Sequence, residues 1–161
     1  MTRIAVVGTG AIGATIAAWL IADPALDVTL CARTPFDRLR VETPDGMLES
    51  HPRLLTDPAG ATPTDWAIVT TKTYDAPGAA RWLDRLVQDG TYVAILQNGV
   101  EHRARFPQLA AERIVPVVVD IPAERTAPGA VGQRRTGRLT IPARPTGEAF
   151  AALFAASPIE L

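Results

Sequence analysis

A short segment near the N-terminus has a glycine spacing that suits the binding of a phosphate group. The segment has the pattern G-x-G-x-x-G and consists of Gly8, Thr9, Gly10, Ala11, Ile12 and Gly13. Between a strand and a helix, the first glycine permits a tight turn, the second leaves room for a pyrophosphate, and the third allows close packing. The pattern predicts that residues 8–13 bind a dinucleotide, and the alternative is a glycine-rich turn without a ligand.

The residues on either side of this turn predict the elements that position it. Ile4–Val7 is a short apolar run that ends at a glycine, as in a strand buried on both faces. After the turn the sequence is rich in alanine, and Ile12, Ile16, Trp19 and Leu20 fall on one side of a helix. The start of such a helix presents N–H groups and partial positive charge to a phosphate. We therefore expect an α/β fold of the Rossmann type, with a doubly wound, mostly parallel sheet.

A cation follows the second predicted strand, Val28–Cys31. In a dinucleotide domain the residue at this strand end lies beside the adenine ribose, where an acid suits the 2′-hydroxyl of NAD and an arginine suits the 2′-phosphate of NADP. The chain has Arg33 there and no acid, because Asp27 precedes the strand, and Thr34 can add a hydroxyl. This favours NADP over NAD. The alternative is that Arg33 is a solvated surface residue.

Polar residues also follow two later strands. Lys72, the only lysine beside fifteen arginines, comes directly after the buried run Asp65–Thr71, and Asn98 follows the strand Thr91–Leu96. Ligands of open α/β sheets bind at the carboxyl ends of the strands, so Lys72 is placed to contact a phosphate, a ribose or an anionic substrate. Asn98 can both donate and accept hydrogen bonds, which suits a carboxamide or a carbonyl. The alternatives are an ordinary loop lysine and a plain Asn-Gly turn.

The remaining sequence predicts the rest of one α/β domain, 1–161. Helical segments are expected at 37–40, 75–88, 100–111 and 147–156. A small β extension is expected from hairpins and strands at 41–55, 114–121, 132–141 and 158–161. Solvated charges are expected at His102, Arg103–Arg105, Arg134 and Arg135.

The composition is typical of a soluble globular protein, with 47% hydrophobic residues, 20% charged residues and a formal net charge of −1. It gives no basis for a nucleic-acid or membrane partner. Cys31 is the only cysteine and is expected in the core, and no stretch resembles a signal peptide or a membrane span, so we predict a cytoplasmic protein. His51 and His102 lack partners at ligand spacing, so no metal site is predicted.

In their joint order these motifs resemble the N-terminal domain of the ketopantoate reductases (2-dehydropantoate 2-reductases). The resemblance extends over essentially all 161 residues and rests on the glycine turn, Arg33, Thr70-Thr71-Lys72, Gln97-Asn98-Gly99 and Pro128-Gly129-x-Val131. It implies NADPH-dependent reduction of 2-dehydropantoate, a small 2-keto acid, to (R)-pantoate, a step toward pantothenate and coenzyme A.

The resemblance also implies roles for individual residues. The family's pyrophosphate contacts correspond to residues 8–13, and its contact to the 2′-phosphate corresponds to Arg33. Lys72 matches a lysine that contacts the cofactor, and Asn98 matches an asparagine that contacts both the cofactor and the substrate. A further cofactor contact is implied near Glu124, ahead of the Pro-Gly turn.

The family's general acid is a lysine in a second, helical domain that has no counterpart in these residues. The resemblance therefore implies no catalytic residue in this chain, and a second domain or subunit that completes the site. Because the sequence ends within a predicted strand, we expect a fragment or a truncated gene product. Two alternatives stay open: a module that binds NADP without chemistry, and the Rossmann domain of another dehydrogenase that acts on 2-keto acids or amino-acid derivatives.

Overall fold

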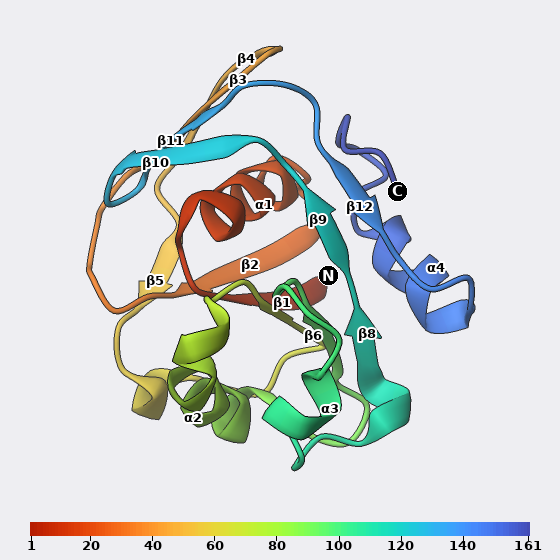
Figure 1. Ribbon diagram of the computed structural model, residues 1–161. Coiled ribbons are helices and arrows are strands. Elements are labelled where there is room, and N and C mark those ends of the chain that lie inside the picture. The colour runs from red at the N-terminus through yellow and green to blue at the C-terminus, as the bar shows by residue number, and fades with distance from the viewer.

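The computed structural model describes residues 1–161 and has a six-stranded parallel sheet at its centre (Figure 1). The strand order is β5-β2-β1-β6-β7-β8. The strands are β1 (Thr2–Val7), β2 (Leu26–Cys31), β5 (Arg53–Leu55), β6 (Trp66–Val69), β7 (Tyr92–Ile95) and β8 (Ile114–Pro116). This is the strand order of the Rossmann fold, with β5 as its third strand in sequence and β8 as its sixth. The predicted fold class is confirmed.

Helices cover both faces of this sheet. α1 (Ala11–Ile21) packs on one face and α2 (Ala76–Leu86) on the other. In β1, Ile4 and Val6 join the core on the α1 side, while Ala5 and Val7 join the core on the α2 side. Because successive side chains of a strand point to opposite faces, an all-apolar strand is one that is buried on both faces. None of the helices combines the length and the apolar sequence that a transmembrane span requires.

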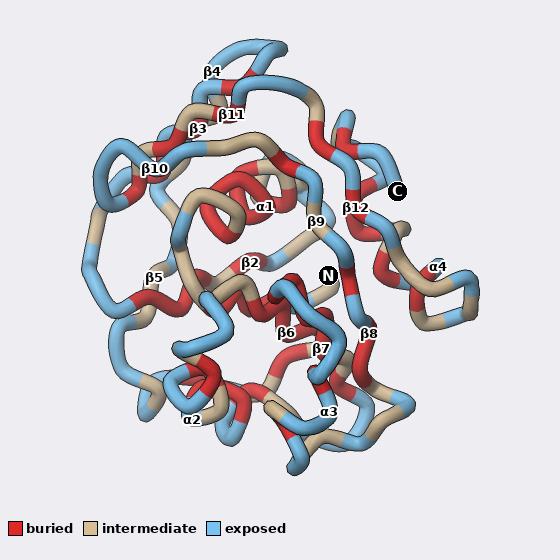
Figure 2. The backbone as a smooth tube through the Cα atoms, viewed as in Figure 1, coloured by how far each residue is buried: buried red, intermediate tan, exposed pale blue.

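A second sheet covers the outer side of α1. Its order is β10-β11-β3-β4, and its strands are β3 (Leu39–Thr43), β4 (Gly46–Ser50), β10 (Ala123–Ala127) and β11 (Ala130–Gln133). Figure 1 shows α1 between β2 and the pair β10–β11, and Figure 2 shows most of α1 buried. Trp19 Nε1 donates to Gln133 Oε1 at 3.1 Å and fastens α1 to this cover. The expected β extension is present, and it encloses α1 from a second side.

The C-terminal part adds a two-stranded sheet and a helix. β9 (Val118–Asp120) pairs with β12 (Arg138–Thr140), and α4 (Pro145–Ala152) lies beside β8.

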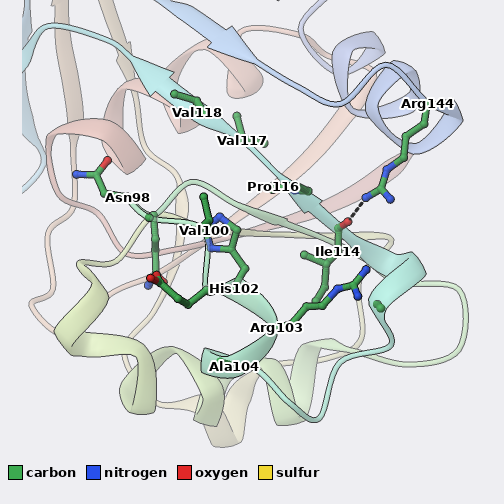
Figure 3. Close-up of a pocket in the computed structure, with 14 residues that line it drawn as sticks. Asn98, Val100, His102, Arg103, Ala104, Ile114, Pro116, Val117, Val118 and Arg144 are labelled. Atoms are coloured by element: carbon green, nitrogen blue, oxygen red, sulfur yellow. Dashed lines mark hydrogen bonds between the residues drawn. The ribbon is translucent and has the colours of Figure 1, made fainter.

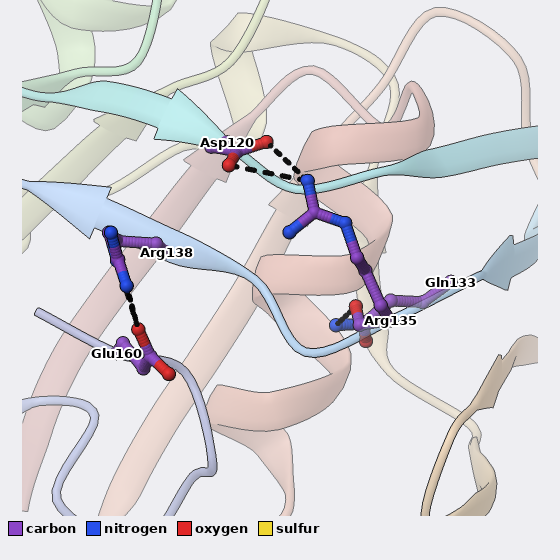
Figure 4. Close-up of polar contacts among 5 residues, drawn as sticks. All are labelled: Asp120, Gln133, Arg135, Arg138 and Glu160. Atoms are coloured by element: carbon purple, nitrogen blue, oxygen red, sulfur yellow. Dashed lines mark hydrogen bonds and ion pairs between the residues drawn. The ribbon is translucent and has the colours of Figure 1, made fainter.

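Ion pairs on the surface connect this part of the chain (Figure 4). Arg135 pairs with Asp120 at 3.1 Å, and Arg138 pairs with Glu160 at 2.7 Å. Arg134 and Arg135 are exposed, as predicted. The strand expected at 158–161 is reduced to a single bridge between Glu160 and Arg138.

Three predicted elements are wrong in detail. The helix expected at 100–111 is reduced to α3 (His102–Arg105), with the single turn η3 (Ala111–Arg113) after it. Gly99 has a φ of +89° before α3, and Pro107 cannot continue a helix after it. The turn expected at 37–40 is not helical and leads into β3, and the strand expected at 114–121 is divided at Val117 into β8 and β9.

Candidate functional site

The turn between β1 and α1 has the geometry that the glycine pattern predicts. Gly8 has a φ of +100°, which residues with a side chain rarely adopt, and its N–H donates to the Cys31 carbonyl at 2.9 Å. A Cβ at Gly13 would collide with the Gly8 carbonyl and with Thr70 Oγ1. Thr70 Oγ1 itself donates to the Gly8 carbonyl at 2.8 Å. The missing side chain at Gly13 therefore allows α1 to start directly against the ends of β1 and β6.

Gly10 leaves the start of α1 open. It is the N-cap residue, no side chain caps the helix there, and a Cβ added to it would have no atom within 4 Å. The first N–H groups of a helix have no partner inside the helix and are available to an anion. No acidic residue lies in the first turn of α1 to compete. The turn thus offers both room and donors, which fits a pyrophosphate.

The turn opens into a cavity of about 1040 Å³, which we call the glycine-turn cavity. Its lining comes from the ends of β1, β2, β5 and β6, from α1 and α2, and from β10. Of the predicted site residues, it brings together Gly8, Thr9, Gly10, Ala11, Ile12, Arg33 and Lys72. Four cations face two carboxylates in this lining: Arg33, Lys72, Arg81 and Arg125 against Asp57 and Asp75. The excess of positive charge suits a ligand with several phosphates.

Arg33 extends from the end of β2 toward the start of α2. Its side chain is 85% exposed, and its Nη1 and Nη2 each lie 3.4 Å from an oxygen of Asp75. Lys72 is exposed at the N-cap of the single turn η2 (Thr73–Asp75), which precedes α2. The two cations predicted from strand ends therefore lie on the same cavity, with a carboxylate facing one of them.

Asn98 lines a different, smaller cavity of about 580 Å³, which we call the Asn98 cavity (Figure 3). The loop after β7 and α3 form one wall, and β8 and β9 form the other. Val100 and Val118 line it and are 89% and 70% exposed. Arg103 and Arg144 contribute cations. Asn98 is therefore not in the lining of the glycine-turn cavity.

Gln97 joins the walls of the two cavities. It is buried and lines the Asn98 cavity, while its Nε2 donates at 2.9 Å to Oγ1 of Thr71, which lines the glycine-turn cavity. Arg105 Nη1 donates to Gln97 Oε1 at 3.5 Å, and Arg105 Nη2 pairs with Glu101 at 2.9 Å. A continuous set of polar contacts thus runs from the end of β6, through Gln97, to α3.

The solvated face predicted for residues 102–105 is wrong at two positions. His102 is buried, and only 17% of the Arg105 side chain is exposed. Burial lowers the pKa of His102, and the nearby Arg105 guanidinium lowers it further, against an opposite effect of Glu101. Charge alone does not reveal this burial, because α3 meets residues of β8 and β9 around the Asn98 cavity only in the fold.

Cys31 is a core residue, as expected. Burial raises the pKa of its thiol to about 12, so the thiol stays protonated and unreactive at neutral pH. No group of three or more His, Cys, Asp or Glu side chains is placed to hold a metal ion.

Glu124 lies next to the glycine-turn cavity but not in its lining. Its carboxylate pairs with Arg134 at 2.7 Å, while Ala123 and Arg125, on either side of it in β10, do line the cavity. Alternate residues of a strand point to opposite faces, so Arg125 is the charged residue of β10 that faces the ligand space.

Among the cations of the cavity, Arg81 and Arg125 were not predicted from the sequence, and neither was the acid Asp75. Arg81 had a sequence signal, because it lies in the helix that follows Lys72. Arg125 had none, because β10 reaches the cavity by pairing with β11 across α1.

Comparison with known proteins identifies relatives over nearly the whole chain. The family model of ketopantoate reductase PanE/ApbA matches residues 4–146. The 2-dehydropantoate 2-reductase of Caulobacter vibrioides is 59% identical over 162 residues, which cover 100% of this chain and 56% of that protein. Its counterpart in Mycobacterium tuberculosis is 36% identical over 155 residues, which cover 94% of this chain and 52% of that protein.

A solved structure agrees with these relatives. The crystal structure of 2-dehydropantoate 2-reductase from Geobacter metallireducens superposes with a TM-score of 0.89 at 28% identity, over 98% of this chain and 56% of that one. The chain thus spans about half the length of the relatives it matches. The family match includes the glycine turn, Arg33, Lys72 and Asn98. The chain therefore belongs to the ketopantoate reductase PanE/ApbA family.

Proposed function

We propose that this chain is the cofactor-binding half of an NADPH-dependent reductase that converts 2-dehydropantoate to (R)-pantoate. The observation that carries the proposal is the glycine-turn cavity, in which the open turn, Arg33 and Lys72 meet although they are far apart in sequence. The relatives in Caulobacter vibrioides and Mycobacterium tuberculosis are named for this reaction, which supports the choice of substrate. The reaction is a step toward pantothenate and coenzyme A.

The open turn and the excess of positive charge in the cavity support NADPH as its ligand. Residues 8–13 would hold the pyrophosphate, because Gly10 leaves space beside the free N–H groups of α1. Arg33 would bind the 2′-phosphate with charge-assisted hydrogen bonds, and Lys72, in the same lining, would also contact the cofactor. We propose that the further contact expected near Glu124 comes from its neighbour Arg125, whose residue lines the cavity.

Asn98 would orient the reacting groups at the nicotinamide end of the cofactor. Reduced nicotinamide, when bound, supplies a hydride for the keto carbon. The side-chain amide of Asn98 can donate to a substrate carbonyl and accept from a carboxamide or ribose hydroxyl. The contact between Gln97 and Thr71 fixes the strand end that carries Asn98 against the strand end that carries Lys72.

We assign no catalytic residue within these 161 residues. Reduction of a ketone needs a proton for the developing alkoxide. His102 is buried with a lowered pKa, and Lys72 is engaged by the cofactor in this proposal. The relatives are about twice as long, so we propose that a second domain or subunit supplies the proton donor. The one buried cysteine, with its protonated thiol, suits the reducing cytoplasm as the location.

The direct test is a calorimetric titration of the purified chain with NADPH and with NADH. We expect saturable binding, with NADPH tighter. Arg33→Ala should weaken NADPH by roughly 1.5–3 kcal/mol and leave NADH nearly unchanged, because only NADPH loses a charge-assisted bond. Arg85→Ala is the matched control, since Arg85 is an exposed arginine of α2 outside the cavity. An equal loss for both cofactors would contradict the role of Arg33.

A second experiment separates the proposed reductase from its alternatives. The chain is joined to the C-terminal half of the Caulobacter vibrioides relative and assayed with a panel of 2-keto acids. Preferential turnover of 2-dehydropantoate supports the proposal. Cofactor binding without any turnover would favour a binding module, and preference for another keto acid would favour a different dehydrogenase.

A further inference from the structure

An acidic side chain occupies the place where the 2′-phosphate of NADPH would meet Arg33. Asp75 lines the glycine-turn cavity, and its two oxygens lie 3.4 Å from Nη1 and Nη2 of Arg33. The two residues come from different strand ends, since Arg33 follows β2 and Asp75 follows β6. The guanidinium that would bind the phosphate is therefore already paired with an acid of this chain.

The conformation of Asp75 indicates that its carboxylate serves the cavity and not its own helix. Asp75 is the N-cap residue of α2, where an aspartate usually accepts a hydrogen bond from the first turn. Its side chain makes no such bond here. By contrast Asp57, the other acid in the lining, accepts from the Ala59 N–H at 2.9 Å and so caps its own turn. Asp75 is thus the carboxylate of this cavity that is directed at Arg33.

The two ribose groups that could occupy this place interact with Asp75 in opposite ways. A 2′-phosphate brings negative charge against the carboxylate and competes for the same guanidinium. A free 2′-hydroxyl can instead donate a hydrogen bond to the carboxylate, as in NAD-binding domains that carry an acid near the ribose. Arg33 and Asp75 together therefore combine the recognition elements of both cofactors.

We infer that Asp75 is a specificity-determining residue that reduces the preference of the cavity for a 2′-phosphate over a 2′-hydroxyl. This inference rests on the proposed binding of NADPH. Lys72, Arg81 and Arg125 keep the cavity positive, so the phosphate still binds, but with an opposing charge beside it. Removing the charge of Asp75 should therefore increase the preference of the cavity for the 2′-phosphate.

The test uses the whole chain and two pairs of probes in calorimetric titrations: NADPH with NADH, and 2′,5′-ADP with 5′-AMP. The second pair reports on the adenosine end alone and does not depend on turnover. Asp75→Asn should raise the preference for the phosphorylated member of each pair by roughly fivefold to tenfold, as expected for removal of one nearby like charge. Asp84→Asn, the same change of charge at an exposed position of α2 outside the cavity, should leave both preferences unchanged.

Asp75→Ser guards against an effect of misfolding, because serine is neutral and also favours the helix N-cap. It should give the same shift as Asp75→Asn, with a thermal midpoint close to that of the unchanged chain. Preferences that stay the same or fall in both variants would overturn the inference. Failure of the proposed function looks different: the unchanged chain would then show no preference for NADPH, or Arg33→Ala would weaken NADH as much as NADPH.

Discussion

The glycine-turn cavity and the Asn98 cavity lie at neighbouring strand ends but are built in different ways. The first is shaped mainly by backbone: the Gly8 N–H donates to the Cys31 carbonyl, the Gly8 carbonyl accepts from the Thr70 hydroxyl, and Gly13 lets the helix start close by. The second is shaped by side chains on a loop and a four-residue helix, and its exposed wall includes Val100 and Val118.

The difference teaches which half of the site is self-contained. Backbone bonded to buried strands keeps its geometry without a ligand, so this turn would be preorganised for the phosphate that we propose it binds. The Asn98 cavity depends on Gln97 and Arg105 for its shape and presents exposed apolar side chains. We therefore expect substitutions around the glycine-turn cavity to change folding stability or phosphate binding. Substitutions around the Asn98 cavity should instead change the contact between the two cavities and the order of the loop after β7.

The largest effect is expected at Gly13. Gly13→Ala places a methyl group against the Gly8 carbonyl and Thr70 Oγ1, so α1 must shift, at about 1–3 kcal/mol of unfolding free energy. NADPH binding should be lost at the same time. Chemical denaturation together with titration measures both quantities.

Gly10→Ala is the matched control within the same turn. A Cβ there meets no protein atom and the φ of −70° is allowed, so stability should fall less than in Gly13→Ala, by at most about 1 kcal/mol for alanine in place of glycine at an N-cap. NADPH affinity should still fall tenfold or more, about 1.4 kcal/mol, because the methyl group occupies the space of the pyrophosphate. If Gly10→Ala bound NADPH normally, the turn would not be the phosphate site.

An intermediate effect is expected at Gln97. Gln97→Ala removes a buried side chain together with its contacts to Thr71 and Arg105, which costs about 1–2 kcal/mol. The thermal midpoint should fall, and NADPH affinity should fall less than in Gly10→Ala. Gln88→Ala, at an exposed glutamine after α2, serves as the control. A Gln97 variant with unchanged stability would show that the two cavities are not coupled through this residue.

The smallest effect concerns pH and His102. Because its pKa is lowered in the folded chain, the unfolded chain binds the extra proton first, and stability declines as the pH falls below about 6.5. His102→Gln should show a smaller decline in thermal midpoint between pH 7.5 and 5.5, with a difference on the order of 1 °C. Identical pH profiles would indicate that His102 titrates normally.

The same contrast explains what could be predicted from the sequence. The glycine turn, Arg33 and Lys72 follow from local pattern, since a strand end fixes the place of the residue after it. The solvated face predicted at 102–105 was wrong at His102 because its burial arises only in the fold, where His102 lines the Asn98 cavity together with Ile114 of β8.

The rest of the site could not be predicted from the sequence, because it depends on contacts between distant segments. The pairing of Arg33 with Asp75 joins residues 42 positions apart, and no pattern in either segment indicates it. Arg125 likewise reaches the cavity only through the sheet that β10 forms over α1.

The enclosure of α1 has a consequence for how the chain matures during synthesis. Two of the four strands that cover its outer side, β10 and β11, are made late, and the bond between Trp19 and Gln133 spans 114 residues. A nascent chain that has not yet released β11 from the ribosome exposes part of the apolar back of α1, so the turn proposed to bind phosphate is translated early and its helix is covered only much later. Such long-range closure slows folding, and the unfinished intermediate is the form most prone to aggregate or to need a chaperone.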